Sequence, residues 1–466
     1  MAGALVRPVT PQYVRSVGGG CLIPGKSARA AGRRGAGYPE RLPMTVRILP
    51  LLVAMLFAAS LAPAAPKNPR KDPKWWKKID HAIDTGVEAL LKTQKKTGRW
   101  PAFEDSRGAV YELGMQSLCM LACVKGGVPL SDMRMRKGMQ AVRSIYEKQK
   151  NNLQTYEVGV TLMLLDAMNE KQLRRFDGKK DKGKRGLSDE DKKWAKDLAV
   201  WLQMKQKPQG FWRYPASGMD LSNTQYAALG LWSAKRLGIR VDKGVVRRMM
   251  TETLKRQQTK GTSKVPFYVD PERVLKRKKG ERSSSTYITA RGWRYHPPER
   301  IKRGGKMVET FYPYSGSMTT AGVAILAIGR DILGKNDDWL DKVQDGKVRR
   351  AMWQGLAWLQ AKWNVWDNPG HSGNWVFYWL YGLERAGRLC GTDYVGLHDW
   401  YVEGANRLLE DQKPDGMWPL KPRNKVPDSQ DEKWQSNQVD TAFAILFLTR
   451  STPMIKTPMP TITGGK

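Results

Sequence analysis

Cysteine is scarce in this 466-residue chain, which contains four in total. Three of them, Cys119, Cys123 and Cys390, follow residue 65, and the first two are four apart on an expected helix. This odd number and this spacing argue against a disulfide framework, even in an exported protein. Acidic residues are also few, because 44 Asp and Glu stand against 80 Lys and Arg, for a net charge of +36. That balance excludes an acidic, halophile-like surface and favours anionic partners.

The apolar stretch over residues 48–61 is too short for a comfortable membrane span. Arg47 precedes it, and the small residues of Ala62-Pro63-Ala64 follow it as a cleavage site. This order is typical of a secretory signal peptide, which we expect over residues 44–65. The sequence therefore predicts export to the periplasm or the extracellular space.

Residues 1–43 show no hydrophobic periodicity. We interpret them as an untranslated or disordered extension, with translation beginning at Met44. Residues 1–65 hold eight Lys and Arg against one Glu, so the net charge without them is still +29. The basic character thus belongs to the mature chain, which begins with a short basic linker over residues 66–74.

Compact catalytic motifs are missing as well. No Gly-rich phosphate loop follows a strand, no GxSxG turn occurs, and no Ser/His/Asp set is legible. No HExxH or i,i+4 partner accompanies His81, His296 or His398, so a metalloprotease is not supported. We expect no cofactor and no metal, although an enzyme whose residues lie far apart in the sequence stays open.

A helix ending in Leu-x-x-x-Gln, or nearly so, recurs along the chain. The terminal glutamines Gln94, Gln149, Gln206 and Gln258 are spaced 52 to 57 residues apart. These helices carry apolar residues at helical period, so each needs another layer to cover one face. A second helix follows each of them and is apolar on nearly every side, which predicts burial.

Six outer and six inner helices are predicted, and a closed ring of six helical hairpins satisfies both patterns. The predicted inner helices begin near Tyr111, Tyr156, Asn223, Ser317, Asn374 and Gln438. We expect an all-α fold, an α/α toroid over residues 75–450 followed by a C-terminal tail over 451–466. Residues 259–316, with fourteen Lys and Arg against five acids, are expected to be a basic insertion. No run favours a sheet.

Three turns that leave outer helices share the pattern QxxxGxW. The Gln amide is suited to bind a helix C-terminus, Gly allows a left-handed turn, and Trp packs across the next repeat. We therefore interpret the motif as a staple between repeats. Its three copies are Gln94-Gly98-Trp100, Gln206-Gly210-Trp212 and Gln412-Gly416-Trp418.

The QxxxGxW pattern resembles the QW motifs of squalene and oxidosqualene cyclases. The six-hairpin layout is similar to the terpenoid cyclase and protein prenyltransferase α/α-toroid superfamily, over about residues 75–450. GWRY at 292–295, YWLYGLERAG at 378–387 and TAFAILFL at 441–448 resemble exported bacterial prenyltransferase and squalene oxidase repeat proteins. The resemblance implies a toroid fold.

The cyclase resemblance also implies an acidic DxDD motif that protonates an alkene or epoxide. The nearest stretch runs from Asn437 to Ala442, with Val439 at the position of the proton-donating Asp. Only Asp440 remains, and a lone carboxylate lacks the neighbouring acid that makes a strong donor. We therefore do not expect triterpene-type cyclisation.

Two other patterns in the sequence resemble metal sites of the superfamily. Residues 337–341 spell DDxxD, which in another class of terpene synthases holds magnesium and a diphosphate, but an exposed acidic turn is the preferred interpretation. Cys390, Asp393 and His398 contain the residue types of the prenyltransferase zinc site in the wrong order. Neither pattern predicts a metal site.

Carboxylates at the starts of the inner helices are the candidate catalytic groups. Aligning these helices places the following residues at equivalent first-turn positions, with Tyr111 and Tyr156 beside the first two: Glu112, Glu157, Gln225, Thr320 and Asp440. In a toroid these ends converge on a central mouth, where carboxylates can act as acid and base or bind a cation. The alternative is acid placement that stabilises helix N-termini.

Three further groups belong to the expected mouth. His371 lies in a Gly-rich turn, and histidine side chains are suited to proton transfer near neutral pH, although a turn residue without chemistry is the preferred interpretation. Trp375 and Tyr378 open an aromatic helix that suits sugar stacking, isoprenoid burial or plain core packing. Glu384 and Arg385 on the same helix are interpreted as a structural ion pair.

The basic insertion interleaves positive and aromatic residues, including Trp293 and Tyr295, and we expect these two to contact a ligand. Its basic residues are Lys276, Arg277, Lys278, Lys279, Arg291, Arg294, Arg300, Lys302 and Arg303. Export argues against specific nucleic acid and favours an anionic glycan, another envelope polymer or a membrane surface. A solvated charge run is the alternative.

We conclude from the sequence that this toroid binds an extended ligand at its mouth, most plausibly a glycan. Tyr111, Tyr156, Trp293, Tyr295 and Trp375 are the expected ligand contacts. Two alternatives stay open. One is an enzyme, either a carbohydrate lyase or hydrolase that uses Glu112, Glu157 and His371, or a divergent terpenoid catalyst that uses Asp440. The other is an envelope scaffold that binds a protein through the insertion.

Overall fold

The structure is a computed structural model, and it describes most of the chain beyond residue 67. The described ranges are 68–101, 111–171, 186–214, 218–268, 271–276, 286–303, 306–310, 312–371, 375–418 and 437–455. The segments predicted as a signal peptide and an N-terminal extension, and most of the predicted C-terminal tail, lie outside these ranges.

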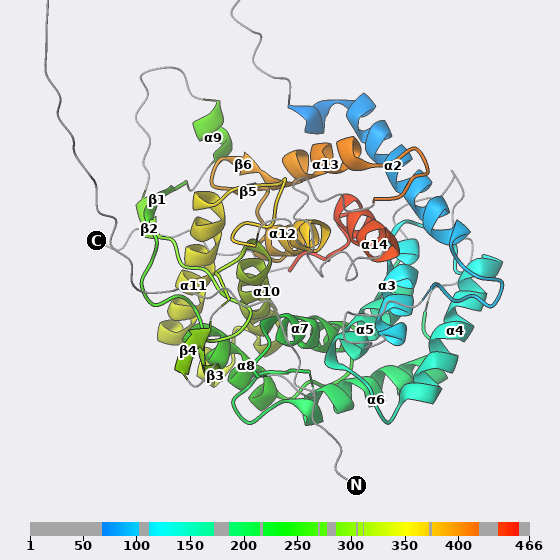
Figure 1. Cartoon of the computed structure of the whole chain (residues 1–466), viewed down its shortest axis with the longest axis horizontal. Helices are drawn as coiled ribbons and strands as arrows, with labels where there is room; N and C mark the ends of the chain where they lie inside the picture. The colour runs from blue at the N-terminus through cyan, green and yellow to red at the C-terminus, as the bar shows by residue number, and fades with distance from the viewer. Residues whose placement is uncertain are drawn as a thin grey trace, which may run out of the picture.

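Two concentric rings of helices form the protein (Figure 1). In the inner ring each helix packs against the next, and the last one returns to the first. Its members are α3 (Glu112–Lys125), α5 (Thr155–Asn169), α7 (Leu221–Arg236), α10 (Gly316–Leu333), α12 (Val376–Cys390) and α14 (Asn437–Leu448). The outer ring is made of α2 (Pro73–Lys92), α4 (Met133–Gln149), α6 (Asp189–Lys205), α8 (Lys243–Lys255), α11 (Lys342–Ala361) and α13 (Trp400–Asp411). The predicted α/α toroid is confirmed.

The hydrophobic patterns explain which helices form which ring. Helix α2 buries Ile79, Ile83 and Val87 on one face and exposes lysines on the other, as an outer helix must. Helix α10 buries every residue from Gly316 to Gly329, because it has neighbours on all sides. Most N-caps are Asp or Ser whose side chains accept a backbone N–H, for example Ser188 of α6.

The three QxxxGxW turns share one hydrogen-bond pattern. In each, the Trp Nε1–H donates to the carbonyl ten residues earlier at 2.8 Å. The Gln Nε2 donates to the carbonyl of its own turn glycine and to a carbonyl of the next outer helix. Gly98, Gly210 and Gly416 have φ values of +81°, +100° and +87°. Each turn therefore ties two consecutive outer helices together.

Trp293 occupies the same place in a fourth turn. The insertion separates this turn from the preceding outer helix, α8. The Trp293 Nε1–H donates to the Thr253 carbonyl at 2.8 Å, and its backbone N–H donates to Thr319 Oγ1 at 3.2 Å. The side chain is fully buried between Gly322 and Gly355, where an added Cβ would clash with it. The prediction that Trp293 contacts a ligand is therefore wrong, because the residue fills the core.

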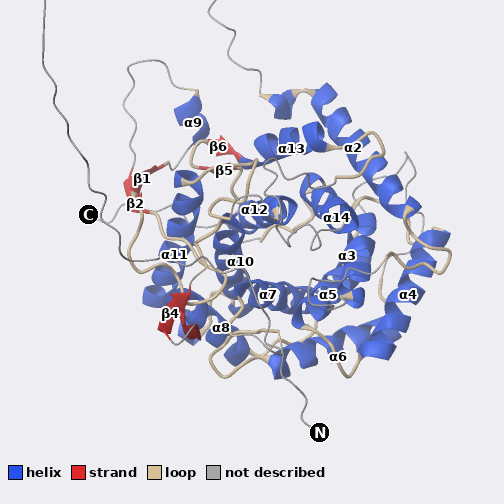
Figure 2. Cartoon of the chain, in the orientation of Figure 1, coloured by secondary structure: helices blue, strands red, loops and turns tan. Residues whose placement is uncertain are grey.

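The insertion contains short β-structure that the sequence did not predict (Figure 2). Two antiparallel hairpins pair β1 (Lys264–Phe267) with β2 (Thr286–Thr289), and β3 (Glu299–Arg303) with β4 (Lys306–Thr310). The short helix α9 (Pro271–Leu275) follows β1, and β5 (Tyr394–Val395) pairs with β6 (His398–Asp399) before α13. Strands of two to five residues, several of them rich in charge, carry no clear period, so our expectation of no sheet was wrong.

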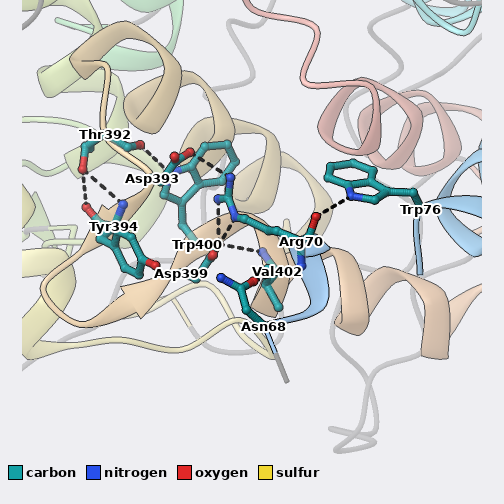
Figure 3. Close-up of polar contacts among 9 residues, drawn as sticks. All are labelled: Asn68, Arg70, Trp76, Thr392, Asp393, Tyr394, Asp399, Trp400 and Val402. Carbon is teal, nitrogen blue, oxygen red and sulfur yellow. Dashed lines mark hydrogen bonds and ion pairs between the residues drawn. The ribbon is translucent and has the colours of Figure 1, made fainter. Parts of the chain in front are cut away.

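Residues 68–71, the first that the structure describes, contact the ring near the starts of α13 and α2 (Figure 3). Arg70, in a 3₁₀ turn over Pro69–Lys71, binds both oxygens of Asp399 at 2.7 and 2.8 Å and also contacts Asp393 at 3.0 Å. Its carbonyl accepts from Trp76 Nε1 at 2.9 Å. These residues belong to the segment that we predicted as a linker, and they form contacts with the toroid.

The cysteines of the described ranges, Cys119, Cys123 and Cys390, are buried and free. Burial raises the pKa of each thiol, because the apolar core disfavours the thiolate. Among the helices that the structure describes, none combines the length and the apolar composition needed to cross a membrane.

Candidate functional site at the mouth of the ring

The inner helices begin at one end of the ring, which we call the mouth. Contacts between their first turns show this arrangement: the Gly114 N–H of α3 donates to Glu157 Oε1 of α5 at 3.3 Å. Tyr378 of α12 reaches Ser222 and Gln225 of α7, with Oη at 3.0 Å from Ser222 Oγ and 2.9 Å from Gln225 Oε1. Residues far apart in the sequence thus meet at the mouth.

A row of aromatic rings crosses the inside of the ring at this level. Tyr156 contacts Tyr226 with ring centroids 4.9 Å apart, and Tyr226 lies stacked 6.4 Å from Tyr378. Tyr378 in turn contacts Phe443 of α14 at 5.6 Å. Since α10 separates α7 from α12 in the ring, Tyr378 bridges the interior rather than a helix–helix seam. Trp375 continues the row toward the loop before α12 at 6.5 Å from Tyr378.

Trp375 holds an unusual backbone conformation at this position. It is the N-cap of α12, with φ +60° and ψ +38°, and its side chain is half-buried. A left-handed conformation is uncommon for a bulky residue and costs conformational energy, which is often found at ligand sites. The structure thus places the predicted contact Trp375 beside Tyr378.

Arg385 lies directly beneath the aromatic row and is fully buried. Its guanidinium carbon is 4.2 Å from the Tyr381 ring centroid, 5.6 Å from that of Tyr226 and 5.7 Å from that of Tyr378. The predicted ion pair with Glu384 is wrong. Glu384 instead accepts hydrogen bonds from the Thr452 N–H at 3.0 Å and Oγ1 at 2.7 Å, because successive helical residues point in different directions.

A buried carboxylate missed in the sequence analysis, Asp220, caps α7 at the mouth. Its Oδ1 accepts the Asn223 N–H at 2.8 Å, and its Oδ2 accepts the Tyr295 hydroxyl at 2.8 Å. Burial raises the pKa of Asp220, while the nearby His296 opposes the rise. Burial also raises the pKa of Tyr295, and the negative charge of Asp220 adds to this shift. Only the N-cap pattern before α7 signals this residue in the sequence.

Tyr295 binds this acid directly, whereas Tyr111 packs against Tyr214. Tyr295 is half-buried, and its carbonyl accepts the Leu221 N–H at 3.2 Å, so the insertion contributes a residue to the mouth. Tyr111 packs edge-on to Tyr214 at 5.9 Å. Burial raises the pKa of Tyr214, and the negative charge of Asp220 adds to this rise. The mouth therefore combines phenol groups with a buried acid.

Glu157 is buried and takes part in a capping box. Its Oε2 accepts the Gln154 N–H at 3.3 Å, while Oε1 accepts from Gly114. Burial raises its pKa to about 7, against the opposing effect of these backbone hydrogen bonds. Glu112, by contrast, is half-buried and bound to Arg99 at 2.8 Å. The two carboxylates therefore have different partners and different burial.

Hydrogen bonds correct the alignment of the inner helices. Thr224, Thr319 and Thr441 each accept the backbone N–H of the tryptophan in the preceding turn, and Gln116 does the same for Trp100. With these acceptors as the reference residues, Gln225 and Thr320 each lie one position after the reference residue of their helix, so these two are equivalent. Asp440 lies one position before its reference residue Thr441, and Glu112 lies four positions before its reference residue Gln116. The predicted equivalence fails because the loops before the helices differ in length.

Asp440 and His371 lie elsewhere on this end of the molecule. Asp440 is 4% exposed in the first turn of α14. His371 is half-buried in the turn before α12, and its N–H donates to the Asn368 carbonyl at 2.9 Å. Asn368 caps α10 through the Ser317 N–H, so this turn holds the start of that helix.

The DDxxD stretch at residues 337–341 and the set of Cys390, Asp393 and His398 have structural roles. Asp337 is 3% exposed and binds Arg247 and Lys243, and the Arg247 guanidinium holds its pKa below the usual range. This corrects the interpretation of the whole DDxxD stretch as an exposed turn. His398 pairs with Glu403 at 3.0 Å. Within the described ranges no cluster of three His, Cys, Asp or Glu side chains is arranged to hold a metal ion.

The basic residues of the insertion are only partly described. Lys276 pairs with Glu272 at 2.8 Å, and the Arg294 guanidinium stacks on Tyr314 at 4.1 Å. Arg277, Lys278 and Lys279 lie outside the described residues, as do the side chains of the basic residues in β3. The structure therefore gives no joint surface for the predicted polyanion contacts.

Comparison with known proteins finds neither a matching family model nor a matching curated sequence. Among solved structures, a type II terpene cyclase from Scytonema, MstE, is 12% identical, with 80% of this chain and 97% of that chain covered and a TM-score of 0.44. The GH76A α-1,6-mannanase from Salegentibacter sp. HEL1_6 is 8% identical, with 80% and 99% covered and a TM-score of 0.48. An inactive variant of that mannanase with α-1,6-mannotetrose is 9% identical, with 80% and 98% covered and a TM-score of 0.49. The toroid assignment rests on the closed double ring itself.

Proposed function

We propose that this protein is an exported glycan-binding toroid and that its mouth holds the glycan. The observation that carries the proposal is the aromatic row that ends in Trp375 and Tyr378, with hydroxyl, amide and carboxylate groups beside it. A sugar has an apolar C–H face and a rim of hydroxyl groups, so it needs a flat aromatic surface next to polar partners. Tyr and Trp supply such surfaces with little loss of side-chain entropy.

The polar groups of the mouth suit neutral hydroxyl partners. Tyr378 Oη bonds to Ser222 and Gln225, and all three side chains both donate and accept hydrogen bonds. A sugar hydroxyl is able to replace any one of these contacts without leaving a charge unpaired. Export, which we infer from the predicted signal peptide, places the protein in a compartment where polysaccharides are abundant.

Binding of an oligosaccharide panel to the chain from Ala65 onward tests the proposal. We expect Trp375→Ala to weaken glycan binding at least tenfold, because it removes the outermost ring of the aromatic row. Trp201→Ala, on the outer helix α6, is the matched control and is expected to bind like wild type. Equal affinity of Trp375→Ala and wild type, or no binding to any oligosaccharide, would contradict the proposal.

The Asp220–Tyr295 hydrogen bond favours a second function, acid–base catalysis on the bound glycan. A phenol held by a buried carboxylate is oriented for proton transfer to or from a ligand. Glu157, with a pKa of about 7, is a further proton donor or acceptor near neutral pH. These groups fit a glycan lyase or hydrolase better than an isoprenoid cyclase, which needs a strong acid.

Asp220→Asn tests this second function cleanly, since Asn caps helices as well as Asp does and the fold is expected to survive. Glycans that bind the wild type are incubated with the protein, and new reducing ends and unsaturated products are measured. A catalytic Asp220 predicts at least a hundredfold loss of turnover with binding changed less than threefold. Turnover that is unchanged in both Asp220→Asn and Tyr295→Phe would refute the assignment.

A further inference from the structure

Arg385 is a fully buried cation. Among the residues that the structure describes, none of its three nitrogens makes a hydrogen bond of good geometry, and its nearest polar neighbours are the neutral hydroxyls of Tyr226 and Tyr378, whose pKa values the guanidinium charge lowers against the larger, opposing effect of burial. Its sequence neighbour Glu384 is engaged by Thr452. A buried charge without a pair is costly, and most buried polar groups in folded proteins are hydrogen-bonded.

The neighbouring unpartnered atoms are also donors. Gln225 Nε2 and the Tyr226 hydroxyl are buried without a hydrogen-bond partner in the described part of the chain, whereas Gln225 Oε1 already accepts from Tyr378. Gln225 and Tyr226 lie on α7, and Arg385 faces them from α12 across the interior. An oxyanion supplies acceptors for the guanidinium and for the Gln225 amide together with a negative charge.

The surrounding rings stabilise the charge only in part. Three tyrosine rings lie 4.2 to 5.7 Å from the guanidinium carbon, which is within the range of cation–π attraction. Ring faces attract the positive charge but leave the five in-plane N–H groups of an arginine without acceptors. A carboxylate or sulfate fills this role with two parallel hydrogen bonds.

Tyr378 provides the route to Arg385. Tyr226 and Tyr381 are 4% and 1% exposed, whereas Tyr378 is half-buried and belongs to the mouth. Its hydroxyl bonds to Ser222 and Gln225, through contacts that ligand hydroxyls are able to replace. Of the three rings around the guanidinium, Tyr378 is therefore the one closest to the mouth surface.

We propose that Arg385 is the acidic-group subsite of the mouth and that it binds the carboxylate or sulfate of an anionic glycan when Tyr378 swings aside. This inference rests on the proposed glycan function and specifies its substrate class. It also separates a specific site from the general attraction of a chain with a net charge of +36. Exposed charges are screened by salt, whereas a buried pair is screened much less.

The test compares three oligosaccharides by calorimetry at 50 and 500 mM NaCl: tetragalacturonate, its carboxyl-reduced neutral counterpart, and a sulfated galactan tetramer. For wild type we expect one acidic ligand to bind at least tenfold more tightly than the neutral one, and this preference to persist at 500 mM NaCl. Which acidic ligand is preferred identifies the oxyanion as carboxylate or sulfate. Arg385→Met is expected to abolish the preference, and the exposed Arg136→Gln is expected to keep it.

Melting of the ligand-free variants supplies an independent measurement. If Arg385 is held for a ligand, replacing it with Met removes an unpaired buried charge, and the melting midpoint is expected to stay equal or rise. A clear fall would show that the arginine is structural and would overturn the inference. Arg385→Lys, which keeps the charge without the planar fork, is expected to bind the acidic ligand with intermediate affinity.

The remaining outcomes also decide between the two proposals. Equal binding of acidic and neutral tetramers by wild type, or an acid preference that survives in Arg385→Met, overturns the acidic subsite and leaves the glycan function standing. A preference that disappears at 500 mM NaCl assigns it to surface charge and overturns the subsite as well. Failure to bind any of the three glycans, or any of the wider panel, overturns the glycan function itself.

Discussion

Gln412 closes the ring, and its replacement tests whether the QxxxGxW turns hold the toroid together. Its Nε2 lies 2.9 Å from the Ala82 carbonyl, 3.1 Å from Thr85 Oγ1 and 3.0 Å from the Gly416 carbonyl. The first two acceptors belong to α2, so this side chain joins the last outer helix to the first. We consider Gln412→Leu, which keeps the approximate size and removes the amide.

The expected loss follows from the number of donors. One amide has two N–H groups to share among three acceptors, so Gln412 makes at most two full hydrogen bonds at a time. Each is worth about 1 kcal/mol net, and Gln412→Leu is therefore expected to lower the free energy of unfolding by about 2 kcal/mol. Gln206→Leu is expected to cost a similar amount, because it also has two acceptors, at 2.8 and 3.3 Å.

Urea unfolding followed by tryptophan fluorescence measures this loss. The midpoint is expected to fall while the dependence on urea stays unchanged, since the native surface is the same. Gln140→Leu, at an exposed position of α4, is the matched control. A Gln412→Leu protein within about 0.5 kcal/mol of the control, less than one net hydrogen bond, would refute the staple interpretation.

Three further perturbations have defined outcomes. Burial raises the pKa of Glu384 from 4.5 to about 7, so the native state binds an extra proton between these values and stability is lost as the pH rises through about 7. From this group we expect the free energy of unfolding to be about 2 kcal/mol lower at pH 8 than at pH 5.5. Denaturant titrations of Glu384→Gln are expected to show a pH dependence smaller by that amount. Arg70→Ala is expected to cost about 1–2 kcal/mol by losing the bidentate pair with Asp399, and a melting midpoint equal to that of wild type would show that the N-terminal segment does not stabilise the ring. Trp293→Phe is expected to lower the free energy of unfolding by about 2–3 kcal/mol, because it leaves a cavity and removes the hydrogen bond to the Thr253 carbonyl, while glycan affinity stays unchanged. Weaker glycan binding at unchanged stability would restore the assignment of Trp293 as a ligand contact.

The helical ring was predictable because its causes are local. Apolar residues at helical spacing define the outer helices, and helices apolar on all sides need neighbours on all sides, so a closed double ring satisfies both. The repeated QxxxGxW turns mark the seams in the same way, since Gln, Gly and Trp act within ten residues of one another. The short strands of the insertion escaped prediction because two to five residues carry too little periodicity.

The mouth was predictable only in outline. Starting every inner helix at the same end brings its first turn to the mouth, and on this ground the hairpin pattern predicts Trp375 at that end. Asp220 was missed because an N-cap aspartate looks the same in the sequence whether or not a tyrosine from a distant insertion binds it. Trp293 was misassigned because the glutamine of its staple, Gln257, lies 34 residues before Arg291, whose carbonyl accepts from Gln257 Nε2, and this separation hides the fourth staple.

The sequence by itself thus determined the order of helices and the closed ring, because these follow from short-range spacing. Only the tertiary structure decided that Tyr378 spans the interior to α7, that Glu384 turns to Thr452, and that Arg385 lies among three tyrosine rings. The contacts of Tyr378 and Glu384 join residues about 70 to 160 positions apart, and their geometry depends on how far each helix is rotated in the ring. Spacing along the chain carries no information about that rotation beyond which face is apolar.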